Sequence, residues 1–152
     1  MPGFVFSLEA VLSHRKRLEE TQQMVFSERK REVDEAEDEL RRLNDEFRRL
    51  TNELRNEHRS LGVEELSLNY AHLQFLDRSI DLQIKVINER RRVLEEARER
   101  LTAVRKDRKV VDRLRERREE EYISEEASRD QKELDDVNSR THGRAARKRG
   151  SQ

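Results

Sequence analysis

The sequence has no cysteine and no tryptophan, and only one proline and four glycines among its 152 residues. Without cysteine it can form neither a disulfide framework nor a thiolate metal site, so nothing indicates an oxidising compartment. No glycine or proline occurs within residues 4–61 or within residues 63–142, and Gly62 separates these two runs. Two long stretches without helix-breaking residues predict two long helices.

Long apolar runs are also absent, because hydrophobic residues make up 32% of the chain and charged residues 45%. This composition cannot enclose a compact globular core. No stretch approaches the ~20 apolar residues of a membrane span or the apolar part of a signal peptide. The 34 basic and 34 acidic residues cancel, which disfavours disorder driven by net charge. We therefore expect a soluble, cytoplasmic protein.

The chain does contain a seven-residue repeat of apolar side chains. In the first run the repeat consists of Phe26, Val33, Leu40, Phe47, Leu54 and Leu61, with Ala36, Leu43 and Leu50 at the alternate position. In the second run it consists of Leu66, Leu73, Ile80, Ile87, Leu94 and Leu101, with Leu76, Ala97, Val104 and Val111 at the alternate position. We call these two rows the seam. More than three heptads in each run predict a coiled coil.

The predicted fold class is all-α, a long antiparallel two-helix coiled-coil hairpin in which the chain folds back near its internal glycine. The first helix is expected over about residues 7–61, the turn over about 62–65 and the second helix over about 66–139. Together they form one predicted coiled-coil domain, residues 1–139.

The second run outlasts the first, so residues beyond about Tyr122 are expected to form a helical C-terminal overhang. From Arg140 onward the chain is basic and has no acidic residue, which predicts a flexible basic tail over residues 140–152. Clustered arginines can bind nucleic-acid phosphates. The tail has no aromatic residue to stack on bases and no nucleic-acid-binding motif, so we expect no nucleic-acid partner.

Catalytic and metal-binding patterns are missing as well. There is no glycine-rich phosphate loop and no His-Glu-x-x-His pattern, and the four histidines are dispersed along the chain. Catalytic carboxylates need a pocket that desolvates them, and a two-helix hairpin has no interior pocket. We expect a protein that is not an enzyme and has no catalytic residue, cofactor or metal.

The chain opens with the segment Phe4-Val5-Phe6-Ser7-Leu8-Glu9-Ala10-Val11-Leu12. This segment resembles the N-terminal pattern Phe-x-Phe-x-Leu-x-x-Val-Leu of the FliJ family of bacterial flagellar export proteins. Asp112-Arg113-Leu114, Glu116-Arg117-Arg118 and Tyr122, with the acidic stretch that follows up to Asp136, are similar to the C-terminal part of that family. The resemblance covers essentially the whole chain.

This resemblance implies a non-enzymatic component of the flagellar type III protein export apparatus. Members act as a coiled-coil stalk, similar to the rotary stalk of F- and V-type ATPases, that promotes assembly and activity of the hexameric export ATPase. They also link this ATPase to the export gate protein FlhA, and export chaperones are a further candidate partner. The implied location is the cytoplasm, with peripheral association to the cytoplasmic face of the cell membrane at the flagellar base, through partners only.

The resemblance further implies two partner-binding sites. The residues that match the gate-binding face are Glu39, Leu43, Glu46, Leu50, His72, Leu76, Ser79 and Gln83, with Tyr70 and Phe75 as nearby exposed candidates. The candidates for contact with the ATPase ring are Arg15, Arg113, Arg117, Arg118, Tyr122, Glu125 and Glu126. The three leucines of the gate set also fit the seam, so coiled-coil packing is their alternative role. The alternative function for the whole chain is a structural coiled-coil scaffold or adaptor unrelated to export, for instance a parallel homodimer.

Overall fold

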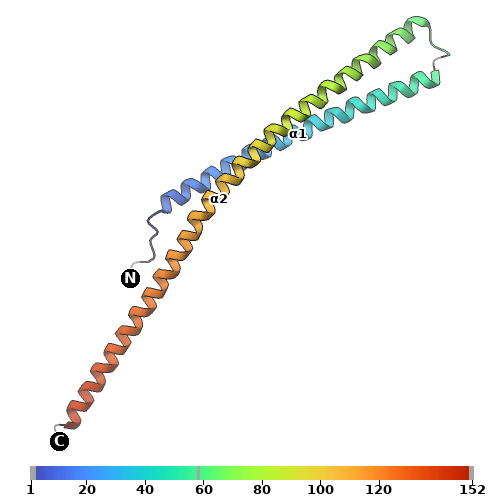
Figure 1. Cartoon of the computed structure of the whole chain (residues 1–152). Helices are drawn as coiled ribbons and strands as arrows, with labels where there is room; N and C mark the ends of the chain where they lie inside the picture. The colour runs from blue at the N-terminus through green and yellow to red at the C-terminus, as the bar shows by residue number, and fades with distance from the viewer. Residues whose placement is uncertain (1–2, 58, 151–152) are drawn as a thin grey trace. The chain divides into compact units, whose positions relative to one another are not determined.

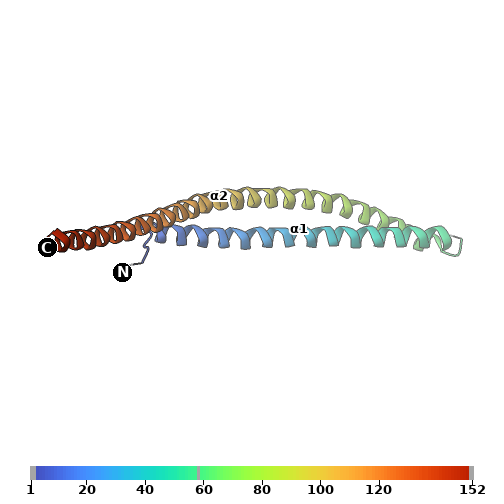
Figure 2. The same cartoon turned by 90° about the horizontal axis from the view of Figure 1, so that it is seen from below.

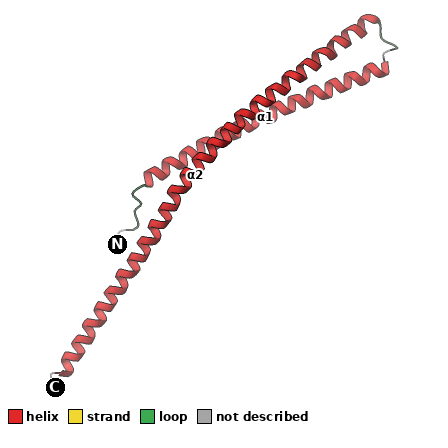
Figure 3. Cartoon of the chain, viewed as in Figure 1, coloured by secondary structure: helices red, strands yellow, loops and turns green. Residues whose placement is uncertain are grey.

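The structure, a computed structural model, describes residues 3–57 and 59–150. It contains two helices, α1 (Glu9–Glu57) and α2 (Val63–Gly150) (Figure 1). The described residues outside these helices form the N-terminal segment and the connection between α1 and α2, and no strand occurs among the described residues (Figure 3). The two helices are antiparallel, so the predicted all-α two-helix hairpin is confirmed.

Contacts along the chain group it into two units. The hairpin unit comprises residues 17–105 and contains most of α1, the connection and the first part of α2. The terminal unit combines the N-terminal segment and first turns of α1, up to residue 16, with the part of α2 that begins at residue 106. This grouping differs from the predicted division into one coiled coil and a tail.

In the hairpin unit the seam is where apolar side chains are removed from water. The buried ones are Val33, Ala36, Leu43, Leu54, Leu76, Ile87, Ala97 and Leu101. All other residues predicted for this part of the seam, such as Phe26, Phe47 and Ile80, are half-buried. Both heptad rows therefore face the partner helix, as the sequence predicts.

Polar side chains at the edge of the seam also connect the two helices. The Gln83 amide nitrogen donates a hydrogen bond to the Ala36 carbonyl oxygen over 2.9 Å, and the Arg90 guanidinium donates one to the Glu32 carbonyl oxygen over 2.9 Å. A helical carbonyl has two lone pairs, so it can accept such a bond beside its intrahelical one. Figure 2 shows α1 and α2 running side by side, in agreement with these contacts.

Helix α1 ends at Glu57, earlier than the predicted residue 61. The backbone nitrogen and the hydroxyl of Ser60 each donate a hydrogen bond to the Glu57 carbonyl oxygen, over 2.9 Å in both cases. Serine competes in this way for carbonyl groups at helix ends and favours a turn. The end of α1 is therefore determined by a polar residue before the glycine.

Helix α2 begins at Val63, directly after Gly62, so the turn does not extend over the predicted residues 62–65. The Gly62 carbonyl oxygen accepts the backbone hydrogen bond of Leu66 at 3.0 Å, and two glutamates in the first turn complement the positive end of the helix dipole. Gly62 does not have a positive φ, and a Cβ atom placed there would meet no atom within 4 Å.

At its other end α2 continues to Gly150, so the prediction that the second helix ends near residue 139 is wrong. The basic segment that was expected to be a flexible tail is helical in its described part, residues 140–150. Arginine and alanine are good helix formers, and one internal glycine costs only ~1 kcal/mol relative to alanine. Basic residues in the last turn also complement the negative end of the helix dipole.

Candidate functional site

The row predicted to face the gate lies in the hairpin unit, and burial divides it into two groups. Leu43 and Leu76 are buried in the seam, Leu76 with 1% of its surface exposed. Leu50, Ser79 and Gln83 are half-buried. The packing role therefore applies to the buried leucines, and a partner can reach only the other residues of this row.

The polar members of the same row meet across the two helices. His72 Nε2 lies 3.3 Å from a carboxylate oxygen of Glu46, so one residue from each helix contributes to this contact. On α1, Arg42 forms ion pairs with Glu39 at 2.6 Å and with Glu46 at 3.3 Å. The hydrogen bond and charge of Arg42 lower the pKa of Glu39. A mixed acidic and basic border therefore lies along α1 beside His72.

A second apolar row lies on the outside of α2, next to this border. Leu68, Phe75 and Leu82 are spaced seven residues apart, and each is more than half exposed. Seven residues are nearly two helical turns, so these side chains share a face. His72 stacks on Phe75 with 6.3 Å between ring centroids, and Val86 continues the row. We call these five residues the outer stripe.

The sequence predicts two residues of the outer stripe, His72 and Phe75, as candidates for the gate contact, and it does not single out Leu68, Leu82 and Val86. The signal of Leu68 and Leu82 was present, because they repeat with the same heptad period as the seam at a different position on the helix. This signal is hard to recognise, because the seam residues repeat with the same seven-residue period in the same stretch of sequence. An exposed apolar row of this kind is typical of a surface that binds another protein.

In the terminal unit the N-terminal segment packs on α2. Phe6 is 5% exposed and Leu12 is 1% exposed. The Arg118 guanidinium lies 5.7 Å from the centroid of the Phe6 ring and also donates a hydrogen bond of 2.9 Å to the Ser7 hydroxyl. This arrangement combines a cation–π contact with a hydrogen bond, and it holds the segment that precedes α1.

Phe4 makes a second contact of the same kind. Its ring lies 5.7 Å from the Tyr122 ring and 5.9 Å from the Arg115 guanidinium, which also forms an ion pair of 3.0 Å with Glu9. This ion pair raises the pKa of Arg115, whereas burial and the hydrogen bond that its hydroxyl donates to Glu126 raise the pKa of Tyr122. We call Phe4, Phe6, Arg115, Arg118 and Tyr122 the N-terminal clamp.

The structure does not bring the predicted ring-binding residues together at one point. Arg118 and Tyr122 belong to the N-terminal clamp. Arg15 forms an ion pair of 3.3 Å with Asp107. Arg113 and Arg117 are exposed and stand one helical turn apart, so both can be reached by a partner.

The remaining two ring candidates mark the start of the overhang, which we define as residues 123–150. Glu125 forms an ion pair of 3.7 Å with Arg129, and Glu126 accepts the hydrogen bond of Tyr122. Every residue of the overhang is exposed except Glu126, which is half-buried. Apolar side chains are among the exposed ones, notably Ile123, Leu134 and Val137.

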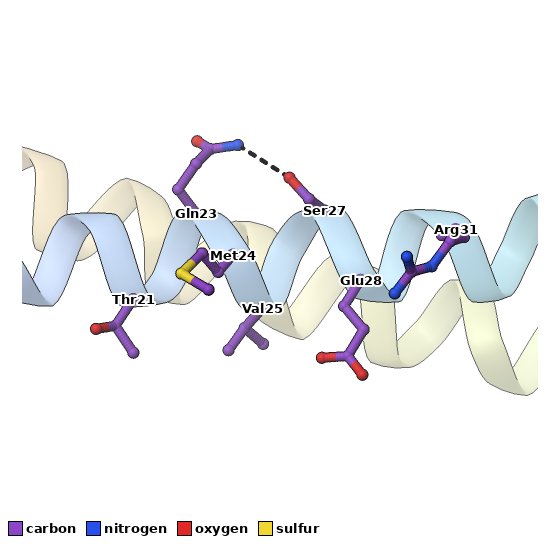
Figure 4. Close-up of a pocket in the computed structure, with 7 residues that line it drawn as sticks. All are labelled: Thr21, Gln23, Met24, Val25, Ser27, Glu28 and Arg31. Atoms are coloured by element: carbon purple, nitrogen blue, oxygen red, sulfur yellow. Dashed lines mark hydrogen bonds between the residues drawn. The ribbon is translucent and has the colours of Figure 1, made fainter.

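The hollows along the helices are open grooves. Figure 4 shows one on α1, whose lining consists of Thr21, Gln23, Met24, Val25, Ser27, Glu28 and Arg31. All of these side chains come from successive turns of a single helix, so they leave the hollow open to solvent. Within residues 3–57 and 59–150 no group of three or more histidine, aspartate or glutamate side chains is placed to hold a metal ion. Neither helix, over its described residues, contains an apolar stretch of the length that a membrane span requires.

Comparison with known proteins bears on the whole chain. Residues 4–147 match the family model described as flagellar FliJ protein. A solved structure, that of the candidate YscO homologue CT670 from Chlamydia trachomatis, is similar with a TM-score of 0.64 and 22% sequence identity. The similarity covers 93% of this chain and 96% of that one, and at this identity it shows a shared fold. No curated protein sequence matches the chain.

Proposed function

Because the chain belongs to the FliJ family of flagellar proteins, and is thus a type III secretion-associated protein, we propose that it is a non-enzymatic stalk of the flagellar export apparatus. It binds the hexameric export ATPase, promotes its assembly and activity, and links it to the export gate protein FlhA. The observation that carries this proposal is the family match over residues 4–147. The antiparallel two-helix hairpin of residues 17–105 supports it.

The ATPase contact belongs to the terminal unit. Arg113 and Arg117 are exposed cationic residues among the ring candidates, and they approach acidic side chains of the ring. Arg118 and Tyr122 act indirectly, because the N-terminal clamp uses them to position the first turns of α1. The ring contact therefore depends on exposed charge supported by a packed aromatic cluster.

The gate contact belongs to the outer stripe of the hairpin unit. Leu68, Phe75 and Leu82 supply apolar area, and Glu39 and Glu46 supply a polar border on α1. An apolar centre with a polar rim is the usual composition of a protein–protein interface. Export chaperones are a third class of partner for this surface. The protein works in the cytoplasm and reaches the membrane face at the flagellar base through these partners.

One experiment with two variants tests both contacts. The first variant carries Arg113→Glu and Arg117→Glu, and the second carries Leu68→Glu and Leu82→Glu. Each is assayed for stimulation and ring assembly of the purified export ATPase and for binding to the cytoplasmic domain of the gate protein. All four positions are exposed, so the fold of both variants should be unchanged.

The first variant should lose most of the ATPase stimulation and keep gate binding, and the second should show the opposite result. Each variant is therefore the control for the other. If neither the natural chain nor its variants stimulate the ATPase although the samples are folded, the stalk function is contradicted. That result would favour a scaffold unrelated to export. Equal loss of both activities in either variant would contradict the assignment of one contact to each unit.

A further inference from the structure

The overhang carries an apolar row that the terminal unit leaves uncovered. Ile123, Ala127, Leu134 and Val137 recur at alternating spacings of four and three residues, with Asp130 in between, which is the core spacing of a coiled coil. The large side chains of this row are each more than half exposed. A helix with a coiled-coil stripe and no helix packed on it has room for a second helix.

Charge along the overhang changes sign from one end to the other. Acidic residues predominate from Glu119 to Asp136, whereas from Val137 to the end of the chain there are only basic and neutral residues. A second overhang laid parallel would place basic half on basic half and acidic half on acidic half. Laid antiparallel, it places each basic half on an acidic half. The charge pattern of the overhang is therefore complementary to that of a second, antiparallel overhang.

The residues beside the stripe repeat this complementarity in detail. Taking Ala127 and Leu134 as core position a of the heptad, the flanking position g is occupied by Glu126, Glu133, Arg140 and Arg147. In an antiparallel pair of helices, g positions face g positions of the other helix. Placing Leu134 against Val137 of the second copy brings Glu133 opposite Arg140 and Glu126 opposite Arg147. The other flanking position contains neutral residues, so no like charges oppose one another there.

From these observations we propose that two copies of this chain form a homodimer by antiparallel pairing of their overhangs. Leu134 and Val137 meet at the centre, Ala127 and Ile123 face Arg144 and Lys148 of the other copy, and symmetry gives two copies of each glutamate–arginine pair. Glu133, Arg140 and Arg147 take part in none of the ion pairs found in the described chain, so the central Glu133–Arg140 pairs form without breaking an existing contact, whereas Glu126 also accepts the hydrogen bond of Tyr122. With few large apolar side chains in the stripe, we expect a Kd on the order of 10–100 µM.

The first measurement is sedimentation equilibrium of the full chain at concentrations on both sides of that Kd, at low and at high salt. We expect a monomer–dimer equilibrium that weakens as salt rises. Leu134→Asp should abolish the dimer, and because Leu134 is exposed the helical circular dichroism should be retained. A chain that stays monomeric at roughly ten times the expected Kd would overturn the proposal, and the stripe would then serve a different protein.

A charge exchange tests the pairing itself. Glu133→Arg and Arg140→Glu, made singly, each place like charges opposite one another twice and should raise the Kd by roughly tenfold or more. Combining both substitutions in one chain restores opposite charges and should restore the dimer. Asp136→Arg is the matched control, because position 136 lies on the far side of the helix from the stripe. Failure of the combined variant to recover would exclude this register.

Orientation is tested by crosslinking, which the absence of natural cysteine makes simple. A mixture of a Leu134→Cys chain and a Val137→Cys chain should form the mixed disulfide, because these positions face one another across the antiparallel pair. The Leu134→Cys chain alone should form much less disulfide-linked dimer. Efficient disulfide formation by the Leu134→Cys chain alone would instead show parallel pairing and overturn the proposal.

Discussion

The two units of this chain stabilise helix pairing by different means. In the hairpin unit, aliphatic side chains such as Leu43, Leu76 and Ile87 repeat along the seam and bury their surface over many turns. In the terminal unit, a short segment is held at a few points, chiefly by the rings of Phe4 and Phe6 and the guanidinium groups that cover them. A repeated seam distributes stability along the helices, whereas the clamp concentrates it in a few contacts.

This difference predicts how each unit responds to loss of a side chain. The largest effect on stability is expected for Leu76→Ala in the hairpin unit, because Leu76 is 1% exposed. The substitution leaves a cavity in the seam, and the side chains of one partner helix cannot fill it. The free energy of unfolding should fall by about 2–5 kcal/mol, measured by chemical denaturation. Leu82→Ala, on the exposed outer stripe of the same helix, is the control and should change it little. Equal effects of both substitutions would contradict the seam assignment.

A smaller and more local effect is expected for Phe6→Ala in the terminal unit. Removing the ring that Arg118 covers should release the N-terminal segment and the first turns of α1. Hydrogen exchange of residues 9–16 should become roughly tenfold faster or more, while amides of the hairpin unit keep their protection. Val5→Ala is the control, because Val5 directly precedes Phe6 in the sequence and its side chain is exposed. Faster exchange throughout the chain would show that the two units unfold as one.

The smallest effect is expected from pH in the hairpin unit. Hydrogen bonds from Arg42 and Arg92 lower the pKa values of Glu39 and Glu89 below the ordinary 4.5. A folded-state pKa below the unfolded one means that the ion pairs stabilise the helix above pH 4.5, and that this contribution is lost as pH falls through the folded pKa. Glu39→Gln should flatten the decline in melting temperature below pH 4.5 slightly. An unchanged profile would show that the Glu39 pair contributes nothing to folding.

The seam could be predicted from sequence because its signal is periodic. Residues from Phe26 to Leu101 that follow the heptad are buried or half-buried, as expected from their spacing alone. The alignment of the two rows was less determined, because heptad rows can pair at any offset of seven residues. The turn then decides the alignment, and Ser60, which ends α1 by its hydrogen bonds to Glu57, places the turn earlier than Gly62 alone predicts.

The contacts of the terminal unit could not be predicted because they have no period. The structure packs Arg118 and Tyr122, two of the candidates for contact with the ATPase ring, on Phe6 and Phe4. Nothing in their spacing indicates which arginine covers a ring and which faces solvent. The extension of α2 to Gly150 has a different cause, because the helix propensity of arginine and alanine outweighs the internal glycine and the like charges of this segment.

The open surroundings of Gly62 have a practical consequence. Because this glycine has no positive φ and its missing side chain would meet no neighbour, Gly62→Cys should leave the turn intact. In a chain without other cysteines, that thiol accepts a single maleimide dye at the tip of the hairpin unit. Polarised single-molecule fluorescence of the dye, recorded while the ATPase turns over, would then show whether the hairpin unit rotates or only rocks.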